Sequence, residues 1–230
     1  MKNKIIKIIG IILLIVLIIF VVYTGRNIYI ISKLSNKAEE TSKCTNYKQI
    51  VYNYNLDNYS KEEIFVMEDK MKIIRTELSG DDVVTITTYA KKIDDNNDKY
   101  LVNMYYDTKE DKKAILNKEI GYTKNLQNEL ETENWWQLFT TSITTSIKNE
   151  TLNGKECYYI TNFDGLNSTP EERMYVDKDA GILNCIISEN KELTTEEREN
   201  SSIIEYRYEF NNVTEDDFNE PNIKDYNIEE

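Results

Sequence analysis

The feature that most constrains this chain is an uncharged, apolar run near its N-terminus. Residues 8–25 read IIGIILLIVLIIFVVYTG and carry no charged side chain. A helix that rises about 1.5 Å per residue would make this run about 27 Å long, close to the ~30 Å hydrocarbon core of a bilayer. The run therefore predicts a single transmembrane helix and makes the membrane the first expected partner.

The flanks of this run predict its orientation. Lys2, Lys4 and Lys7 precede it, and Tyr23 near its far end suits a membrane interface. A cleaved signal peptide is the alternative, but the run is longer than the usual hydrophobic region and no A-x-A-like site follows it. We expect an uncleaved anchor with residues 1–25 forming the cytoplasmic tip and the span, and with the rest of the chain outside the cell.

Composition excludes several classes of function. The chain has 41 acidic and 28 basic residues, a net charge of −13, and no histidine. Because nucleic-acid binding rests on Lys and Arg neutralising phosphates, it is not expected. Without histidine, Ser-His-Asp triads, Cys-His pairs and H-E-x-x-H metal sites cannot form. We expect a non-enzymatic protein without a cofactor or metal; a hydrolase of unrecognised type is the weaker alternative.

Other features have ordinary interpretations. The acidic run at 94–98 could supply oxygen ligands to Ca²⁺, but it lacks the glycine and distal glutamate of an EF-hand, so a solvated turn is expected. Cys44, Cys157 and Cys185 lack a C-x-x-C motif and fit either small, partly buried side chains or one disulfide with a spare thiol. Abundant Ile, Asn and Lys, with few Gly and Pro, indicate the A/T-rich genome of a Gram-positive bacterium.

Periodicity divides the remainder of the chain. At 26–44, Ile28, Ile31, Leu34 and Ala38 recur at helical spacing, which predicts a juxtamembrane helix. It could be a stalk that continues the transmembrane helix or an amphipathic helix packed on the following domain, and the apolar stripe favours the second.

From residue 48 onward the apolar pattern has the period of two that is typical of strands. Strands are predicted at 64–67, 71–78, 83–89, 100–106, 157–163, 173–177, 182–188 and 205–210, with turn residues such as Asn153-Gly154 between them. One helix is predicted at 134–147, while 117–131 could be helix or loop. The expected fold class is α+β, mainly β: a curved antiparallel sheet, or half-barrel, over 45–230, covered by one or two helices and preceded by the transmembrane helix.

The helix predicted at 134–147 carries the candidate ligand-binding residues. Its apolar side chains share one face, and it holds both tryptophans of the chain. The hypothesis is a lid over a pocket for an amphiphile, because Trp combines a large apolar surface with an N–H donor; the alternative is that Trp135 belongs to the core. The candidates are Trp135, Trp136, Leu138, Phe139 and Ile143.

Three segments of the C-terminal third resemble the LolA/LppX/RseB-like group of extracytoplasmic proteins. They are GKECYYI at 154–160, MYVDKDAGIL at 174–183, and YRYEFNNV at 206–213 running into DFNEP at 217–221. The second is similar to the group's aromatic-Val-Asp-x-x-[ST]-Gly-hydrophobic hairpin, with Ala180 in place of Thr or Ser. The resemblance implies a half-barrel that holds acyl chains or an acylated partner.

Two hypotheses for function follow. The first is a membrane-anchored extracytoplasmic domain that binds a lipid, an acyl chain or a lipidated partner in the concavity of the sheet. The second is a protein-interaction or sensory ectodomain of an envelope regulatory system, which has no ligand cavity and binds another envelope protein through an acidic, Tyr-rich face.

Overall fold

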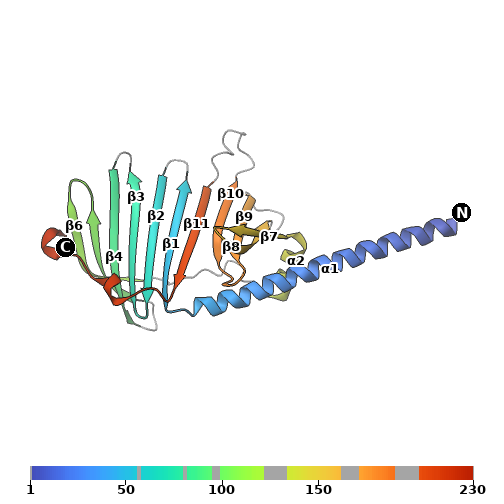
Figure 1. Ribbon diagram of the computed structural model, residues 1–230, viewed down its shortest axis with the longest axis horizontal. Helices are drawn as coiled ribbons and strands as arrows, with labels where there is room; N and C mark the ends of the chain where they lie inside the picture. Colours follow the sequence, from blue (N-terminus) through green and yellow to red (C-terminus); the bar gives the residue numbers. More distant parts are fainter. Residues whose placement is uncertain are drawn as a thin grey trace.

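One long helix projects from a single open, curved sheet (Figure 1). A computed structural model describes residues 2–55, 58–79, 82–94, 99–121, 134–161, 171–189 and 202–229. The helices are α1 (Lys2–Ser42) and α2 (Trp135–Thr144), with two short 3₁₀ helices, η1 (Glu215–Phe218) and η2 (Ile223–Asp225). The predicted class, mainly β with helical cover, is confirmed.

The sheet joins two meanders through one late strand. β11 (Ser202–Phe210) lies between the two groups, in the order β12-β6-β5-β4-β3-β2-β1-β11-β10-β9-β8-β7. All pairings are antiparallel except that of β12 with β6, so the sheet is mixed at one edge. The other strands are β1 (Asn46–Asn55), β2 (Asn58–Met67), β3 (Lys70–Ser79), β4 (Asp82–Asp94), β5 (Lys99–Asp107), β6 (Lys112–Gly121), β7 (Ser146–Leu152), β8 (Lys155–Thr161), β9 (Glu171–Asp177), β10 (Leu183–Glu189) and β12 (Asn227–Glu229).

Local features explain why the sequence analysis missed two of the strands, β6 and β7. In β6 the register shifts opposite Asn103, and Asn117 has a φ of 55°, so a bulge interrupts the alternation of side chains. β7 begins only two residues after α2 ends, where the prediction extended the helix to 147. The segment there is rich in threonine, and Thr145 donates its hydroxyl back to the Thr141 carbonyl at 2.7 Å, an alternative to continued helix.

α1 unites two segments that the sequence treats separately. It runs unbroken through residues 25 and 26, and its first half carries a segment long and apolar enough to cross a membrane, with a mean hydropathy of 3.5 and no buried side chain. Its second half packs on the sheet domain through Ile31 and Leu34, both 0% exposed. The helix at 26–44 therefore both continues the apolar helix and packs on the domain.

The two faces of the sheet differ in what covers them. The helix face is the one on which α1 packs, against β7, β8, β9 and β10. The tail face is the opposite one, and residues 215–226 cross it over β3, β4 and β5. The three cysteines are free thiols, so the disulfide considered from the sequence is absent.

Candidate functional site: the open half of the helix face

One half of the helix face is filled by α1. Ile30, Ile31 and Leu34 form a buried cluster with strand residues of β7–β10: Ile147, Ile160, Met174, Val176 and Leu183. At the turn between β9 and β10 the approach is closer still, since a Cβ added to Gly181 would lie 2.4 Å from the Leu34 carbonyl oxygen. The middle of this half is therefore a packed core.

Hydrogen bonds fasten α1 to this half near the point where it leaves the domain. Asn27, 0% exposed, donates from Nδ2 to the carbonyls of Ser142 at 3.0 Å and Thr145 at 2.9 Å. The Tyr23 hydroxyl donates to the Thr145 carbonyl at 2.6 Å, and Arg26 donates to the Ile147 carbonyl at 3.2 Å. These carbonyls belong to the last turn of α2 and the start of β7, so α1, α2 and the sheet edge form one unit.

In the part of the chain that the structure describes, α1 and α2 do not cover the other half of the helix face, over β1–β5, and we call it the open half. Residues directly opposite each other in antiparallel strands point to the same side, and two rows of side chains follow from the register. Among the described residues, no helix contributes a side chain to the buried cluster beside these rows. Tyr206 packs on the cluster that α1 fills, so the open rows, which we define by their half-buried apolar members, are Val51, Ile73, Ile86, Met104, Tyr106 and Tyr208.

The open rows contain a charged pair and lie next to a buried apolar cluster. Toward one end of the strands the same face is buried, because Met71 (2% exposed) and Val102 (0%), two residues along from Ile73 and Met104, belong to a buried cluster. Within the rows, Arg75 binds Glu62 with its Nε at 2.9 Å and its Nη2 at 2.7 Å. An apolar surface with one charge-neutralised polar pair can accept an acyl chain and a polar headgroup together.

The tail face supports the same strands from behind. The Lys72 ammonium donates to the Asp217 carbonyl at 2.8 Å, and the Tyr89 hydroxyl to the Asn219 carbonyl at 2.9 Å. The Tyr105 hydroxyl donates to the Glu220 carboxylate. Burial and this hydrogen bond to a carboxylate both raise the pKa of Tyr105. Among the described residues, the tail therefore braces β3–β5 on the tail face, and on their helix face Ile73, Ile86 and Met104 stay half-buried.

A hollow lies at the C-terminal end of α1 and differs in character from the open rows. It encloses about 730 Å³ between Thr41 and Cys44, the turns before β8 and β10, and the end of β11. Asp177 lines it but is already occupied, because its Oδ1 accepts hydrogen bonds from the backbone N–H groups of Asp179 and Ala180. We regard it as a polar cleft between turns rather than an acyl site.

The five candidates predicted from the sequence lie together on α2, away from the open rows. α2 packs beside α1 at the β7 end of the sheet (Figure 1). Leu138 packs on the buried cluster of α1, and Phe139 and Ile143 are half-buried. Trp135 and Trp136 are each 65% exposed, so the alternative that Trp135 is a core residue is wrong. The sequence analysis missed the open rows because each strand contributes only one or two ordinary apolar residues to them. Only the register of the strands brings these residues together.

The described residues contain no group of three or more Cys, Asp or Glu side chains placed to hold a metal ion. Of the acidic run at 94–98, residues 95–98 lie outside the part of the chain that the structure describes.

Comparison with known proteins finds distant similarities among solved structures. No protein-family model and no curated protein matches the chain. A crystal structure of MucB is 10% identical with a TM-score of 0.43, and it covers 83% of this chain and 62% of MucB. The complex of Pseudomonas aeruginosa MucA and MucB is 10% identical with a TM-score of 0.42, and the match covers 83% of this chain and 61% of the other. A LolA superfamily protein from Nitrosomonas europaea is 8% identical with a TM-score of 0.25, and the match covers 82% of this chain and 97% of the other. The chain spans about three fifths of the length of MucB.

Proposed function

We propose that this chain is a single-pass, membrane-anchored, extracytoplasmic domain without enzymatic activity. It binds a lipid, an acyl chain or a lipidated partner on the open rows of the helix face. The observation that carries the proposal is the asymmetry of that face: α1 fills one half with its own side chains, and half-buried apolar side chains line the other half.

The exposed half of α1 supports the membrane anchor. From Ile5 to Val22 every large apolar side chain is at least 42% exposed, a much larger apolar surface than a soluble protein presents to water. Cleavage near residue 25 would separate Tyr23 and Thr24 from a helix that is already packed on the domain. An uncleaved anchor with residues 26–230 outside the cell accounts for both halves of the helix.

A photoactivatable long-chain fatty acid tests the ligand site. The full chain is reconstituted in lipid nanodiscs, irradiated with the probe, and the labelled peptides are mapped by mass spectrometry. We expect labels on β3–β5 peptides that carry Ile73, Ile86 or Met104, in addition to labels on the membrane-spanning residues. Labels confined to residues 5–22 would contradict the proposal.

Two substitutions on β4 provide a matched pair for that experiment. Ile86→Glu places a charge in the open rows and should abolish labelling of β3–β5. Val83→Glu places the same charge on the tail face of the same strand, where the native side chain is 42% exposed, and should leave labelling unchanged. Equal labelling of both variants would show that the probe does not bind the open rows.

The exposed edge of β7 favours a second function, recognition of an envelope protein. β7 pairs with β8 on one side, and in the described residues no strand pairs with its other side. Lys148, Asn149, Glu150 and Thr151 are exposed along it, and an extended segment of a partner could add to such an edge.

A pair of charge substitutions tests this second function. Asn149→Lys with Thr151→Lys would place two charges on the edge, and charged side chains oppose strand addition. The variant should lose any envelope protein that crosslinks to β7 in cells, whereas substitutions in the open rows should retain it. Retention of the partner by the lysine variant would contradict strand addition.

A further inference from the structure

An aromatic patch on α2 is exposed, and no element that the structure describes covers it. The patch consists of Trp135, Trp136 and Phe139. The Phe139 ring stacks on Trp135 with centroids 5.3 Å apart and an interplanar angle of 13°, and its centroid lies 5.8 Å from that of Trp136. Each indole is nevertheless 65% exposed. Two adjacent exposed tryptophans are a large apolar surface for a helix of ten residues, and their position indicates what covers them.

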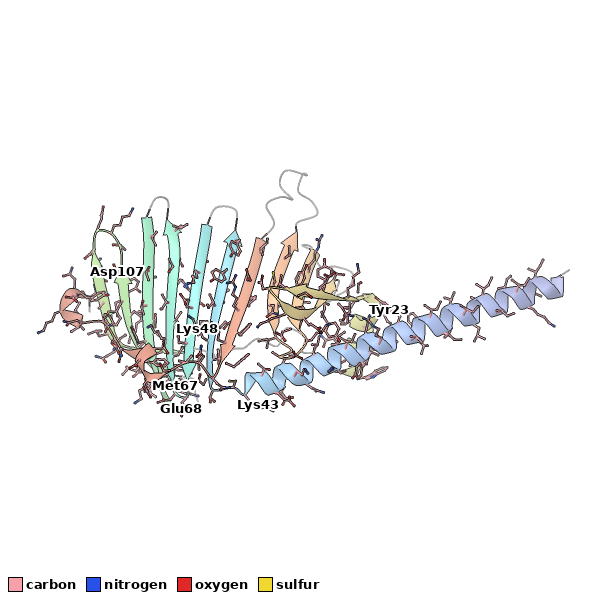
Figure 2. The ribbon with its side chains drawn as sticks, viewed as in Figure 1. Tyr23, Lys43, Lys48, Met67, Glu68 and Asp107 are labelled. Carbon is pink, nitrogen blue, oxygen red and sulfur yellow. The ribbon has the colours of Figure 1, made fainter. Side chains whose placement is uncertain are left out.

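α2 is attached to α1 at the point where α1 leaves the domain. The Asn27 and Tyr23 side chains bind carbonyls at the C-terminal end of α2, and Leu138 packs on the cluster that contains Ile30 and Ile31. Figure 2 labels Tyr23 at this point, beyond which α1 extends alone. Along the axis of α1, α2 is therefore attached at the level of residues 23–31.

That level coincides with the headgroup layer of a bilayer that α1 would cross. If residues 8–25 span the hydrocarbon core, the polar layer outside it is roughly 5–7 Å thick on each side. At about 1.5 Å per residue, this layer corresponds to the next four or five residues of α1, the segment to which α2 is bonded.

The chemistry around α2 suits this layer. Tyr23 and Tyr29 of α1 are 39% and 66% exposed, and Trp and Tyr are the residues that gather at membrane interfaces. Arg26 and Lys33 are exposed on the same stretch, and no acidic residue precedes Glu39, although the chain as a whole has a net charge of −13. Anionic headgroups attract such a basic segment, while the acidic body is repelled from the surface.

We propose that the aromatic patch inserts into the headgroup layer of the membrane that α1 crosses and forms a second contact that orients the domain. This inference rests on the proposed anchoring by α1 and is independent of a ligand on the open rows. A single transmembrane helix leaves a domain free to rotate about the membrane normal and to tilt. Because α1 and α2 are fastened to the sheet, a second contact beside α1 restricts the tilt and sets the height of the open rows above the membrane.

Trp135 and Trp136 are the only tryptophans of the chain, so intrinsic fluorescence reports on the patch alone. The full chain is reconstituted into vesicles of phosphatidylcholine and phosphatidylglycerol. We expect an emission maximum shifted to the blue of its value in the urea-unfolded protein, reduced quenching by aqueous iodide, and stronger quenching by a spin label near the headgroup than by one at the end of the acyl chain. Emission that is quenched freely by iodide and insensitive to both spin labels would overturn the inference.

A relocated tryptophan gives the matched control. In a Trp135→Phe/Trp136→Phe background, Ile228→Trp places the only indole on β12, at the edge of the sheet opposite β7, where the native side chain is 61% exposed. This variant should be quenched by iodide and unaffected by lipid spin labels; sensitivity equal to that of the native chain would mean that the quenching is not specific to the patch.

Flotation of the vesicles separates the two proposals. A chain that does not float with the vesicles contradicts anchoring by α1. A chain that floats but keeps water-exposed tryptophans contradicts the patch inference alone.

Discussion

The two halves of the sheet are covered on opposite faces. Over β7–β10, α1 covers the helix face with Ile31 and Leu34. Over β3–β5, residues 215–226 cover the tail face through Asp217, Asn219 and Glu220. Among the described residues, one continuous sheet therefore has a core filled by α1 in one half and half-buried apolar rows without a covering helix in the other. The position of the covering segment thus decides which side chains of the helix face are buried.

The packed half should be the sensitive one. Leu34→Ala removes a side chain that is 0% exposed and leaves a cavity between α1 and the sheet. We expect a loss of about 2–5 kcal/mol in the free energy of unfolding, measured by denaturant titration of the full chain in nanodiscs. Lys33→Ala, at the exposed neighbouring position, should change it by less than about 0.5 kcal/mol. Equal effects would mean that α1 does not pack on the helix face as described.

The attachment of α1 to α2 should contribute less than the apolar core. Asn27→Ala removes the donors to the Ser142 and Thr145 carbonyls inside a buried site. We expect the unfolding free energy to fall by about 1–3 kcal/mol. Asn36→Ala, on an exposed face of the same helix, is the matched control and should be neutral. A neutral result for both variants would contradict a structural role for Asn27.

The half supported by the tail should show its own dependence on pH. Because the pKa of Tyr105 is raised in the folded protein, its contribution is fully present below the unfolded value of about 10 and is lost as the pH rises through the folded value. At neutral pH, where the hydrogen bond to Glu220 is intact, the free energy of unfolding of Tyr105→Phe should be about 1 kcal/mol lower than that of the native chain. As the pH rises above ~10, the unfolding free energy of the variant should fall by less than that of the native chain. Parallel stability curves at alkaline pH would refute this.

The smallest effect is expected on the tail face at Glu63. Its carboxylate lies 2.9 Å from the Lys48 ammonium and 2.6 Å from that of Lys61. Burial opposes ionisation, but the two lysines outweigh it and lower the pKa of Glu63. The stabilisation is present above the unfolded value of about 4.3 and is lost as the pH falls through the folded value. Glu63→Gln should cost less than about 1 kcal/mol at pH 7; an unchanged acid limb of the stability curve would contradict the ion pairs.

Period-two patterns and turn residues predicted much of the sheet, because those signals are local. The predicted strands at 64–67 and 205–210 lie within β2 and β11. The bulge at Asn117 and the threonine-rich end of α2 were missed because they depend on how neighbouring strands pair.

For the candidate sites too, the sequence reveals what is local and misses what depends on strand pairing. The sequence singles out Trp135 and Trp136, because adjacent tryptophans are conspicuous, but it cannot show that both are exposed. The open rows depend on the register of six strands. Met104 on β5 and Tyr208 on β11 lie 104 residues apart and share a row only in the folded sheet.

Two methionines allow the central claim to be tested in one spectrum. Met104 is half-buried in the open rows, and Met174 is 5% exposed in the cluster filled by α1. The full chain in nanodiscs, with ¹³C-labelled methionine methyl groups, is titrated with octanoate. The account predicts a saturable shift of the Met104 methyl signal and none of Met174. A shift of Met174 alone, or of neither methyl group, would contradict an acyl-binding surface on the open half.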